Sequence, residues 1–181
     1  MPIHLIWGDN AAAIDQEIDV LIKQILDPAW SAMNLSRLDG NDPTQAKQAL
    51  EEVRSPPLGQ GGRIVLLKRS PFLNNCTNEM ANLFENTINL IPENSFLVLN
   101  NISKPDGRLK TTKIVQKLIK SNIIRENKFI LPAIWDFTGQ AKLVEETAKN
   151  LGLKIEPEAL HKIVETTSND SKKIYSELQK L

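Results

Sequence analysis

The sequence predicts an α/β fold: a parallel five-stranded sheet with helices on both faces, followed by a small domain of three helices. Two observations lead to this fold class. Up to about residue 130, short apolar runs alternate with amphipathic stretches of ten or more residues, which is typical of a parallel sheet with right-handed helical crossovers. From Thr138 onward the periodicity is helical only. We therefore expect one domain over residues 1–132 and a second over residues 133–181.

The first two strands and their helices follow from apolar patterns and turn residues. Ile3–Trp7 is a short apolar run that ends at Gly8-Asp9-Asn10, which predicts a strand and a turn. Isoleucine and leucine then recur at helical spacing. Met33–Leu38 alternates apolar and polar residues, as a half-buried strand does. A further helix is expected from Asp42-Pro43 to about Arg54, because proline suits the first helical position.

The remaining strands are expected after a break in regular structure. Residues 55–62 (Ser-Pro-Pro-Leu-Gly-Gln-Gly-Gly) contain two prolines and three glycines, which excludes a helix or a strand there. Apolar runs then predict strands over Arg63–Lys68 and Ser95–Asn100, and a fifth strand is expected over Ile123–Phe129. The helices expected between these strands cover about Asn75–Leu90 and Lys110–Lys120.

The second domain is expected to contain three short helices, over Thr138–Leu151, Glu156–Thr167 and Asp170 to the end. Thr138 and Asn169-Asp170 can cap the first and the third, because their side chains accept hydrogen bonds from free helical N–H groups. Pro157 suits the first turn of the second helix. Pro132 marks the break between the two domains.

Composition excludes several classes of protein. The chain has 181 residues, of which 41% are hydrophobic and 24% charged, as in an ordinary globular protein with a buried core. No run approaches the ~20 apolar residues that cross a bilayer, and the start lacks a secretory signal, so we expect a cytoplasmic protein without membrane contact. A single cysteine, Cys76, excludes an internal disulfide, a thiolate zinc cluster and a CxxC redox pair. We expect neither a metal nor a cofactor.

Charge is distributed unevenly, although the net charge is zero. Residues 1–56 carry nine acidic and four basic side chains, a net charge of −5, whereas residues 101–129 carry eight basic and two acidic side chains, a net charge of +6. The basic segment can form a face near a phosphate backbone. It can also be a solvated helix face whose charge the acidic segment balances, and composition alone favours this second interpretation.

The first turn lacks the residues that bind a nucleoside triphosphate. A strand followed by a turn and a helix is the usual phosphate site of an α/β sheet, and hydrolysis requires the pattern GxxxxGK[ST] there. This chain has Gly8-Asp9-Asn10-Ala11-Ala12-Ala13-Ile14-Asp15, with one glycine, no lysine and two acidic residues. The glycine-rich run Gly59–Gly62 lies between a helix and a strand, the reverse of the required order, so a flexible turn is favoured there.

Other residues with reactive side chains lack partners in the sequence. His4 and His161 have no acid or cysteine at a spacing that indicates a catalytic dyad or a metal site. Cys76 has no neighbouring base, which favours a packing or surface role over a nucleophile. Asp136 lies in an aromatic stretch between the domains and is expected to cap a helix. The chain therefore has the scaffold of a phosphate-handling enzyme without its catalytic loop.

The order of several motifs along the chain is informative. They are Leu5-Ile6-Trp7-Gly8-Asp9-Asn10, the segment 55–66, Phe96-Leu97-Val98-Leu99, Ile155–Leu160, and Asn169-Asp170 followed by Ile174–Leu181. Together they resemble the delta subunit of the bacterial DNA polymerase III clamp loader over nearly the whole chain. The resemblance implies an AAA+ module that does not hydrolyse ATP, made of a Rossmann-like domain and a three-helix lid. The family's third domain, a helical collar that joins the loader subunits, would lie beyond Leu181.

The resemblance also implies contact residues and partners. In the family, two adjacent hydrophobic residues before a glycine insert into a pocket of the ring-shaped sliding clamp, the beta subunit, and help to open it. The matching residues here are Pro57-Leu58 before Gly59, where the family more often has Leu-Phe or Phe-Phe, and Phe72-Leu73 is a second candidate pair. Further implied partners are the tau/gamma and delta-prime subunits, mainly through the collar, and DNA indirectly. The expected DNA-proximal basic face consists of Lys104, Arg108, Lys110, Lys113 and Lys117.

Two functions from different classes remain open at this point. The first is a clamp-opening subunit, without chemistry of its own, in a DNA polymerase (nucleotidyltransferase) holoenzyme. The second is a small α/β enzyme that uses a nucleotide or a phosphate through a non-standard loop. A delta-prime subunit is a weaker third possibility, since it would have a cysteine-rich zinc segment and a Ser-Arg-Cys motif, and neither is present. Only the first function expects clamp binding without nucleotide binding.

Overall fold

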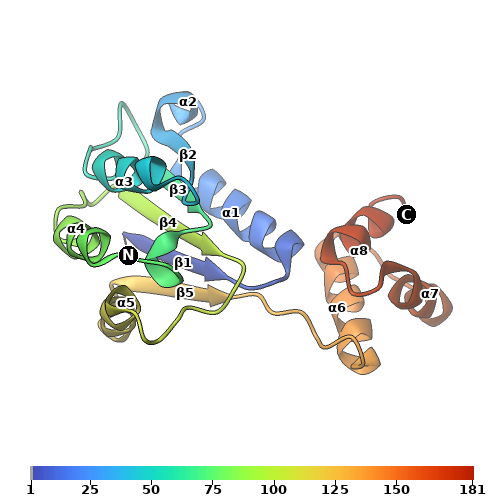
Figure 1. Ribbon diagram of the computed structural model, residues 1–181. Helices are drawn as coiled ribbons and strands as arrows, with labels where there is room; N and C mark the ends of the chain where they lie inside the picture. Colours follow the sequence, from blue (N-terminus) through green and yellow to red (C-terminus); the bar gives the residue numbers. More distant parts are fainter. Residues whose placement is uncertain (1) are drawn as a thin grey trace. The chain divides into compact units, whose positions relative to one another are not determined.

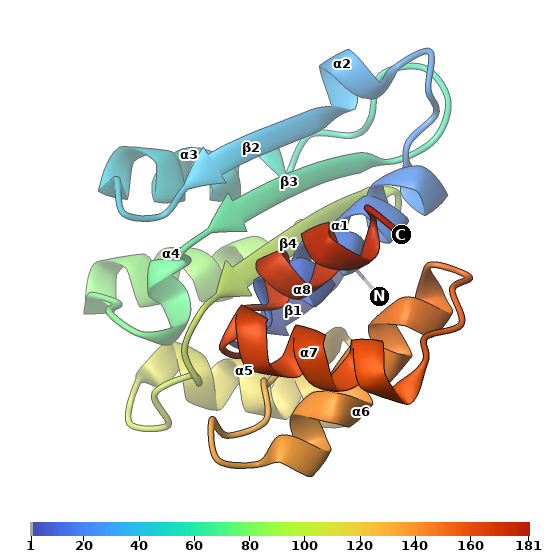
Figure 2. The same cartoon turned by 90° about the vertical axis from the view of Figure 1, so that its right-hand side faces the viewer.

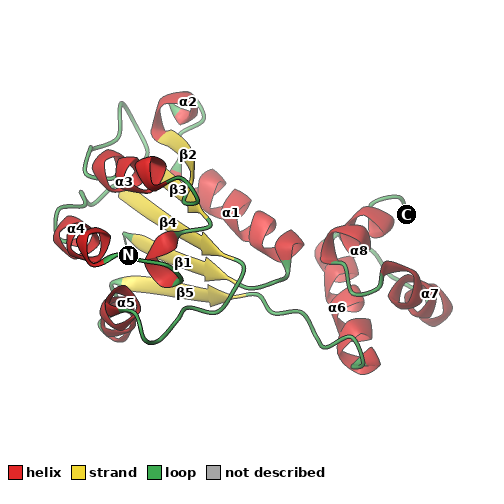
Figure 3. Ribbon diagram, viewed as in Figure 1, coloured by secondary structure: helices red, strands yellow, loops and turns green. Residues whose placement is uncertain are grey.

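The computed structural model describes residues 2–181 (Figures 1 and 3). Its elements in chain order are β1 (Ile3–Trp7), α1 (Ala11–Ile25), α2 (Ser31–Asn34), β2 (Leu35–Asp39), α3 (Pro43–Glu52), β3 (Arg63–Lys68), the 3₁₀ turn η1 (Pro71–Leu73), α4 (Asn78–Ile88), β4 (Ser95–Asn101), α5 (Lys110–Lys120), β5 (Ile124–Lys128), α6 (Phe137–Asn150), α7 (Pro157–Thr167) and α8 (Ser171–Leu178). The predicted fold class, a parallel five-stranded α/β sheet followed by three helices, is confirmed.

Two compact units make up the chain. The first contains residues 1–7 and 17–128, and the second contains residues 8–16 and 129–181. The first turns of α1 therefore group with the three C-terminal helices. That residues 1–132 and 133–181 form separate domains stays a prediction.

The sheet of the first unit has the order β2-β3-β4-β1-β5, and every neighbouring pair is parallel. Ile3 of the central strand β1 pairs with Leu97 on one side and with Ile124 on the other. α3, α4 and α5 cover one face of the sheet, and α1 runs along the other face (Figures 1 and 2). Loops that precede the strands gather at one edge of the sheet, and loops that follow them gather at the opposite edge.

The core of the first unit explains why its strands were predictable. All five residues of β1 are buried, and the four central residues of β3 are buried as well, which is the pattern of strands covered on both faces. α3 and α4 pack against this core through small and aromatic residues such as Ala46, Ala49 and Phe84. Phe84 stacks on Phe72, with ring centroids 4.8 Å apart.

The second unit is held by its own small core. Val144 and Ala148 of α6 pack with Val164 of α7 and with Ile174 and Leu178 of α8. Side-chain caps define where its helices begin. Asp136 accepts a hydrogen bond from the Gly139 N–H at 2.9 Å, and Asp170 accepts from the N–H groups of Lys172 and Lys173 at 3.0 and 3.2 Å.

Some predicted element boundaries were wrong, and each error has a local cause. The second strand begins at Leu35, because the preceding residues form the short helix α2. The helix expected from about Asn75 begins only at Asn78, after Thr77, whose side chain caps it. The separate turn η1 precedes it. α6 is capped by Asp136, as expected for that residue, and Thr138 lies inside the helix.

Candidate functional site

The turn after β1 is closed by the chain's own backbone. Gly8 has φ +142°, and a Cβ added to it would lie 1.8 Å from the Phe129 carbonyl oxygen. Only glycine therefore fits at this position. The Asn10 N–H donates to the same carbonyl oxygen at 3.1 Å. The backbone at Phe129 thus packs against this turn and binds one of its N–H groups.

The N–H groups at the start of α1 also have intramolecular acceptors. The Ala11 N–H donates to the Asp9 carbonyl at 3.0 Å, and the Ala13 N–H donates to Asn10 Oδ1 at 3.1 Å. The Ala12 N–H donates to Ser171 Oγ at 3.3 Å. These amides are the groups that bind phosphate in nucleotide-binding α/β proteins. In this chain they are already satisfied.

A small hollow of about 230 Å³ lies beside this turn in the second unit. Its lining includes Asn10, Gln16, Glu146 and Asn150 but no lysine or arginine. The carboxylate of Glu146 would repel a phosphate group, and no cationic side chain in the lining offsets this repulsion. The hollow therefore does not have the chemistry of a triphosphate site.

The loop at residues 55–62 holds Leu58 at the protein surface. The Leu58 side chain is 50% exposed, while its backbone is bound on both sides by Asn34. The Leu58 N–H donates to Asn34 Oδ1 at 2.8 Å, and Asn34 Nδ2 donates to the Leu58 carbonyl at 2.8 Å. Asn34 itself is fully buried. The geometry fixes the backbone of Leu58 and leaves about half of the residue exposed.

Further contacts fasten the same loop on both sides of Leu58. Gly59 has φ +69°, and a Cβ added to it would lie 2.2 Å from the indole ring of Trp30. At the far end, the Gly62 N–H donates to the Ile25 carbonyl at 2.8 Å. At the near end, Ser95 Oγ donates to the Ser55 carbonyl at 2.8 Å. The run of prolines and glycines, which the sequence suggested as a flexible turn, is a loop with defined contacts.

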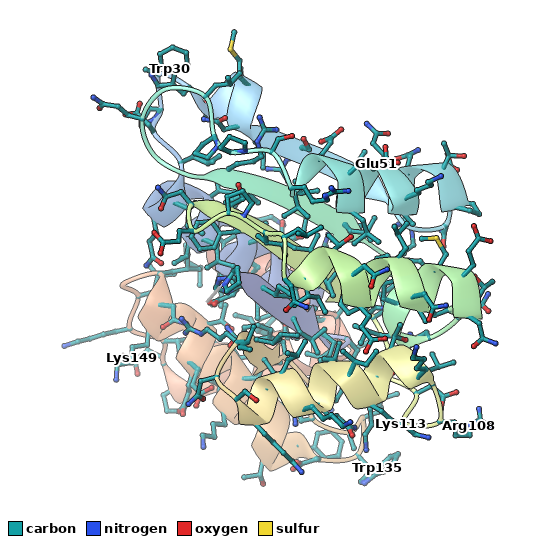
Figure 4. All side chains as sticks on the ribbon, turned by 90° about the vertical axis from the view of Figure 1, so that its left-hand side faces the viewer. Trp30, Glu51, Arg108, Lys113, Trp135 and Lys149 are labelled. Atoms are coloured by element: carbon teal, nitrogen blue, oxygen red, sulfur yellow. The ribbon has the colours of Figure 1, made fainter. Side chains whose placement is uncertain are left out.

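The predicted basic face lies along α5 and the loop before it. Its members, Lys104, Arg108, Lys110, Lys113 and Lys117, are all exposed, and Figure 4 shows Arg108 and Lys113 at one end of this helix. Arg108 pairs with Asp106 at 2.8 Å, and Lys110 pairs with Glu85 at 3.0 Å. Among residues 2–181, no ion pair is formed by Lys113 or Lys117. The unpaired positive charge of this face therefore lies on α5 and, at Lys104, on the loop before it.

Comparison with protein families identifies the chain. Residues 4–128, which include β1, the loop at 55–62 and α5, match the family model described as DNA polymerase III, delta subunit. The chain belongs to the DNA polymerase III delta subunit family. No match was found among curated protein sequences.

The fold of this family member is similar to that of a clamp-loader protein of known structure. The Bacillus subtilis DNA clamp loader delta protein YqeN is similar over 99% of this chain and 52% of its own length, with a TM-score of 0.76 and 20% identity. The chain therefore spans about half the length of that protein. Two other solved structures are less similar. The Thermotoga maritima RuvB Holliday junction branch migration motor has a TM-score of 0.48 and 12% identity, over 99% of this chain and 53% of its own length. The replication initiator DnaA bound to AMPPCP and single-stranded DNA has a TM-score of 0.49 and 14% identity, over 98% of this chain and 54% of its own length.

In this delta-family chain, the second candidate pair, Phe72-Leu73, lies in the core. Both side chains are fully buried. Thr111 Oγ1 donates to the Phe72 carbonyl, and Thr112 Oγ1 donates to the Leu73 carbonyl at 3.5 Å. A buried side chain of this kind cannot contact a partner without local unfolding, so we do not retain this pair as a contact site.

The histidines and the cysteine of this delta-family chain have environments that suit structural roles. Burial, with a contribution from the Arg125 charge, lowers the pKa of His4 to about 4. Burial raises the pKa of the Cys76 thiol, the opposite of what an activated thiolate needs. His161 is exposed and lies 3.4 Å from Glu165. Within residues 2–181, no three histidine, cysteine or carboxylate side chains are grouped as metal ligands.

Another hollow, of about 470 Å³, lies at the edge of the sheet where β2, β3 and β4 end. Asn41, Arg69, Asn74 and Asn101 are among its lining residues. The Arg69 guanidinium is already paired with Asp39, which lowers the pKa of that carboxyl. The charge of Arg69 is thus largely compensated within the protein.

In residues 2–181 there is no helix with the length and apolarity needed to span a bilayer.

Leu58 was singled out from the sequence, but the residues that contact its loop were not. Asn34 and Trp30 lie 24 or more positions earlier in the chain, and the sequence pattern around them indicated only the start of a strand. The glycine at position 59 was a signal for a turn, but not for its contact with an indole ring. Such contacts depend on tertiary structure and leave no local pattern.

Proposed function

We propose that this chain is a clamp-loader delta subunit that binds the sliding DNA clamp, the beta subunit, through Leu58 and helps to open the ring without hydrolysing ATP. The observation that carries the proposal is the half-exposed leucine on a loop whose backbone is bound by Asn34 and Trp30. Pro57 and Gly59 flank it and complete the contact loop. Membership of the delta subunit family supports the same partner.

The mechanism uses apolar contact rather than bond chemistry. A leucine that enters a pocket on another protein loses its hydration, and this transfer is worth roughly 1.5–3 kcal/mol. Because the loop backbone is already ordered, little conformational entropy remains to be lost on binding. The clamp conformation that offers the pocket would be stabilised relative to the one that does not. Binding energy of this size can favour an opened clamp interface.

The satisfied amides at the start of α1 support a role without nucleotide hydrolysis. They disfavour the second candidate function, a nucleotide- or phosphate-using enzyme. The other loader subunits, tau/gamma and delta-prime, are further proposed partners, and we propose that they bind mainly through a collar domain. A cytoplasmic location is part of the same proposal.

For DNA we propose proximity rather than independent binding. Lys113 and Lys117 are exposed and carry uncompensated charge on α5. A few lysines neutralise few phosphates, so their contribution should be weak and should decrease steeply with salt. Retention of DNA by this chain alone at about 150 mM salt would contradict this part of the proposal.

The test of clamp binding compares two exposed apolar residues. Leu58→Ala should weaken binding to the cognate sliding clamp by about ten- to a hundredfold. Ile102→Ala is the matched control, because Ile102 is exposed and follows β4, at the opposite edge of the sheet from the 55–62 loop. Ile102→Ala should bind the clamp as the unchanged chain does. If the unchanged chain does not bind the clamp, the proposed function is wrong.

A further inference from the structure

Leu58 belongs to a larger apolar surface that includes residues from a second segment. Trp30 is 39% exposed, Met33 is 62% exposed and Leu58 is 50% exposed. Trp30 and Met33 come from the segment around α2, which lies beside the 55–62 loop in both views of the ribbon (Figures 1 and 2). Figure 4 shows the Trp30 side chain at the outer end of this region. We name these three residues the tip surface.

Direct contacts join the two segments of the tip surface. The backbone of Gly59 packs against the Trp30 indole, which leaves no space for a Cβ. Asn34 of α2 binds the Leu58 backbone through two hydrogen bonds. Next to them, Leu26 forms a β-bridge with Gly61. The three apolar side chains are therefore carried by one interlocked structure rather than by independent loops.

The composition of the tip surface is typical of the centre of a protein interface. Tryptophan is enriched among the residues that dominate binding energy, and methionine adapts to irregular apolar partners. Leucine alone offers a small contact compared with two adjacent large residues. Adjacent exposed apolar side chains of this size usually mark an interaction site.

We propose that Trp30 and Met33 contact the sliding clamp together with Leu58, and that Asn34 positions Leu58 for this contact. The inference rests on the proposed function, because the partner is the same clamp. It goes beyond that function by extending the contact site to a segment that lies about 25 residues earlier in the chain. The additional contact area offsets the small size of the Pro57-Leu58 pair.

Asn34 is a positioning residue rather than a contact residue, since its side chain is fully buried. Its side-chain amide accepts a hydrogen bond from the Leu58 N–H and donates one to the Leu58 carbonyl. A residue of a neighbouring β-strand pairs with a backbone in the same way. Loss of these bonds would release the loop, and clamp binding would then have to order it again. The effect of Asn34 on affinity should therefore act through Leu58.

The first experiment measures clamp affinity for single variants of the tip surface. Met33→Ala is the cleanest variant, because most of its side chain is exposed, and it should weaken binding about threefold. Trp30→Ala should weaken binding about tenfold or more, whereas Trp30→Phe, which keeps an aromatic ring beside Gly59, should lose less. Ile102→Ala again serves as the control. Affinities of Met33→Ala and Trp30→Ala within twofold of the unchanged chain would overturn the inference.

A second measurement does not depend on whether Trp30→Ala folds well. In a Trp135→Phe background the exposed Trp135 no longer contributes to fluorescence, and Trp7 is buried. Clamp binding should then reduce acrylamide quenching of the Trp30 emission. The Trp30→Phe, Trp135→Phe double variant gives the signal to be subtracted. Unchanged quenching of Trp30 at saturating clamp would also overturn its assignment as a contact.

The third experiment tests positioning by a double-mutant cycle. Asn34→Ala should weaken clamp binding several-fold at a temperature well below its unfolding transition. If Asn34 acts through Leu58, the same substitution in the Leu58→Ala background should have little further effect on affinity. A purely structural role would reduce stability equally in both backgrounds without this dependence. Additive losses of affinity would refute the positioning role.

These outcomes separate the inference from the proposed function. If the unchanged chain does not bind the clamp, both fail. If it binds and only Leu58→Ala loses affinity, the proposed function stands and the inference is wrong. If Leu58→Ala, Met33→Ala and Trp30→Ala all lose affinity, the tip surface is the clamp-contact site.

Discussion

Gly59 controls how the 55–62 loop lies on the indole ring of Trp30. Its φ of +69° and the contact with the ring both exclude a Cβ. Asn34 determines the position of Leu58, the residue before Gly59, through two hydrogen bonds to its backbone. A buried amide and a glycine thus fix the place of an exposed leucine. The proposed contact of Leu58 therefore depends on the buried Asn34, whose side chain is not itself exposed to a partner.

We predict that Gly59→Ala destabilises the loop and weakens clamp binding. The strained φ alone costs roughly 1–2 kcal/mol for a residue with a Cβ, and the clash with Trp30 adds to this. Thermal unfolding of the variant should begin at a lower temperature, with a matching loss of clamp affinity. Gly107→Ala is the control, since nothing lies within 4 Å of its added Cβ. Equal unfolding temperatures for the two variants would contradict the described loop geometry.

The burial of His4 is expected to make the stability of the protein depend on pH. Its pKa is about 4 in the folded protein, against 6.5 for an ordinary histidine, so the unfolded chain binds more protons between these values. The free energy of unfolding should therefore decrease as the pH falls from about 6.5 to about 4, by at most about 3 kcal/mol. Above pH 6.5 this contribution is fully present.

Chemical denaturation at a series of pH values measures this effect. His4→Leu should flatten the dependence in that window, because the group that takes up the proton is gone. A pH dependence of the same size in His4→Leu would mean that other groups cause it.

At the scale of elements, the start of α1 differs from a phosphate-binding helix by the use of its N–H groups. A nucleotide-binding turn leaves them free and adds a lysine and a hydroxyl for the phosphates and magnesium. Here the amides bind Asp9, Asn10 and Ser171, and the Asn10 amide binds Phe129. α1 therefore has the position of a phosphate-binding helix but lacks the free N–H groups, the lysine and the hydroxyl that bind phosphate and magnesium.

We predict that calorimetric titration with MgATP gives no binding in the micromolar range. Ser171→Ala frees the Ala12 N–H but supplies neither a lysine nor a magnesium ligand, so it should not create a site. Micromolar affinity for either protein, abolished by a substitution at the first-strand turn, would favour the nucleotide-using enzyme.

Strands whose central residues form an apolar run could be predicted from the sequence, and the edge strand β2 could be predicted less well. The central residues of β1, β3 and β4 are buried and mostly apolar, because both faces of these strands are covered. β2 is an edge strand of intermediate burial, and its pattern merged with that of α2. Of the three residues of the tip surface, only Leu58 was singled out from the sequence. Asn34 could not be predicted, because its role depends on a contact between segments 24 positions apart.

At the scale of the whole molecule, stability and the proposed binding depend on different residues. The core of the first unit is formed by buried side chains of the central strands, such as Leu66 and Leu99. The tip surface contributes little to this core, since its side chains lie partly or mostly in solvent. Substitutions in the two places should therefore affect different measurements.

The last prediction compares Leu58→Ala with Leu66→Ala. A fully buried leucine such as Leu66 should cost about 2–5 kcal/mol of stability when truncated and lower the melting temperature, because a cavity remains. The folded fraction of that variant should still bind the clamp normally. Leu58→Ala should do the reverse: an almost unchanged melting temperature with clamp affinity reduced by about ten- to a hundredfold. A large loss of stability in Leu58→Ala with unchanged affinity would show that this leucine is part of the fold, and the clamp contact would then have to be sought elsewhere on the surface.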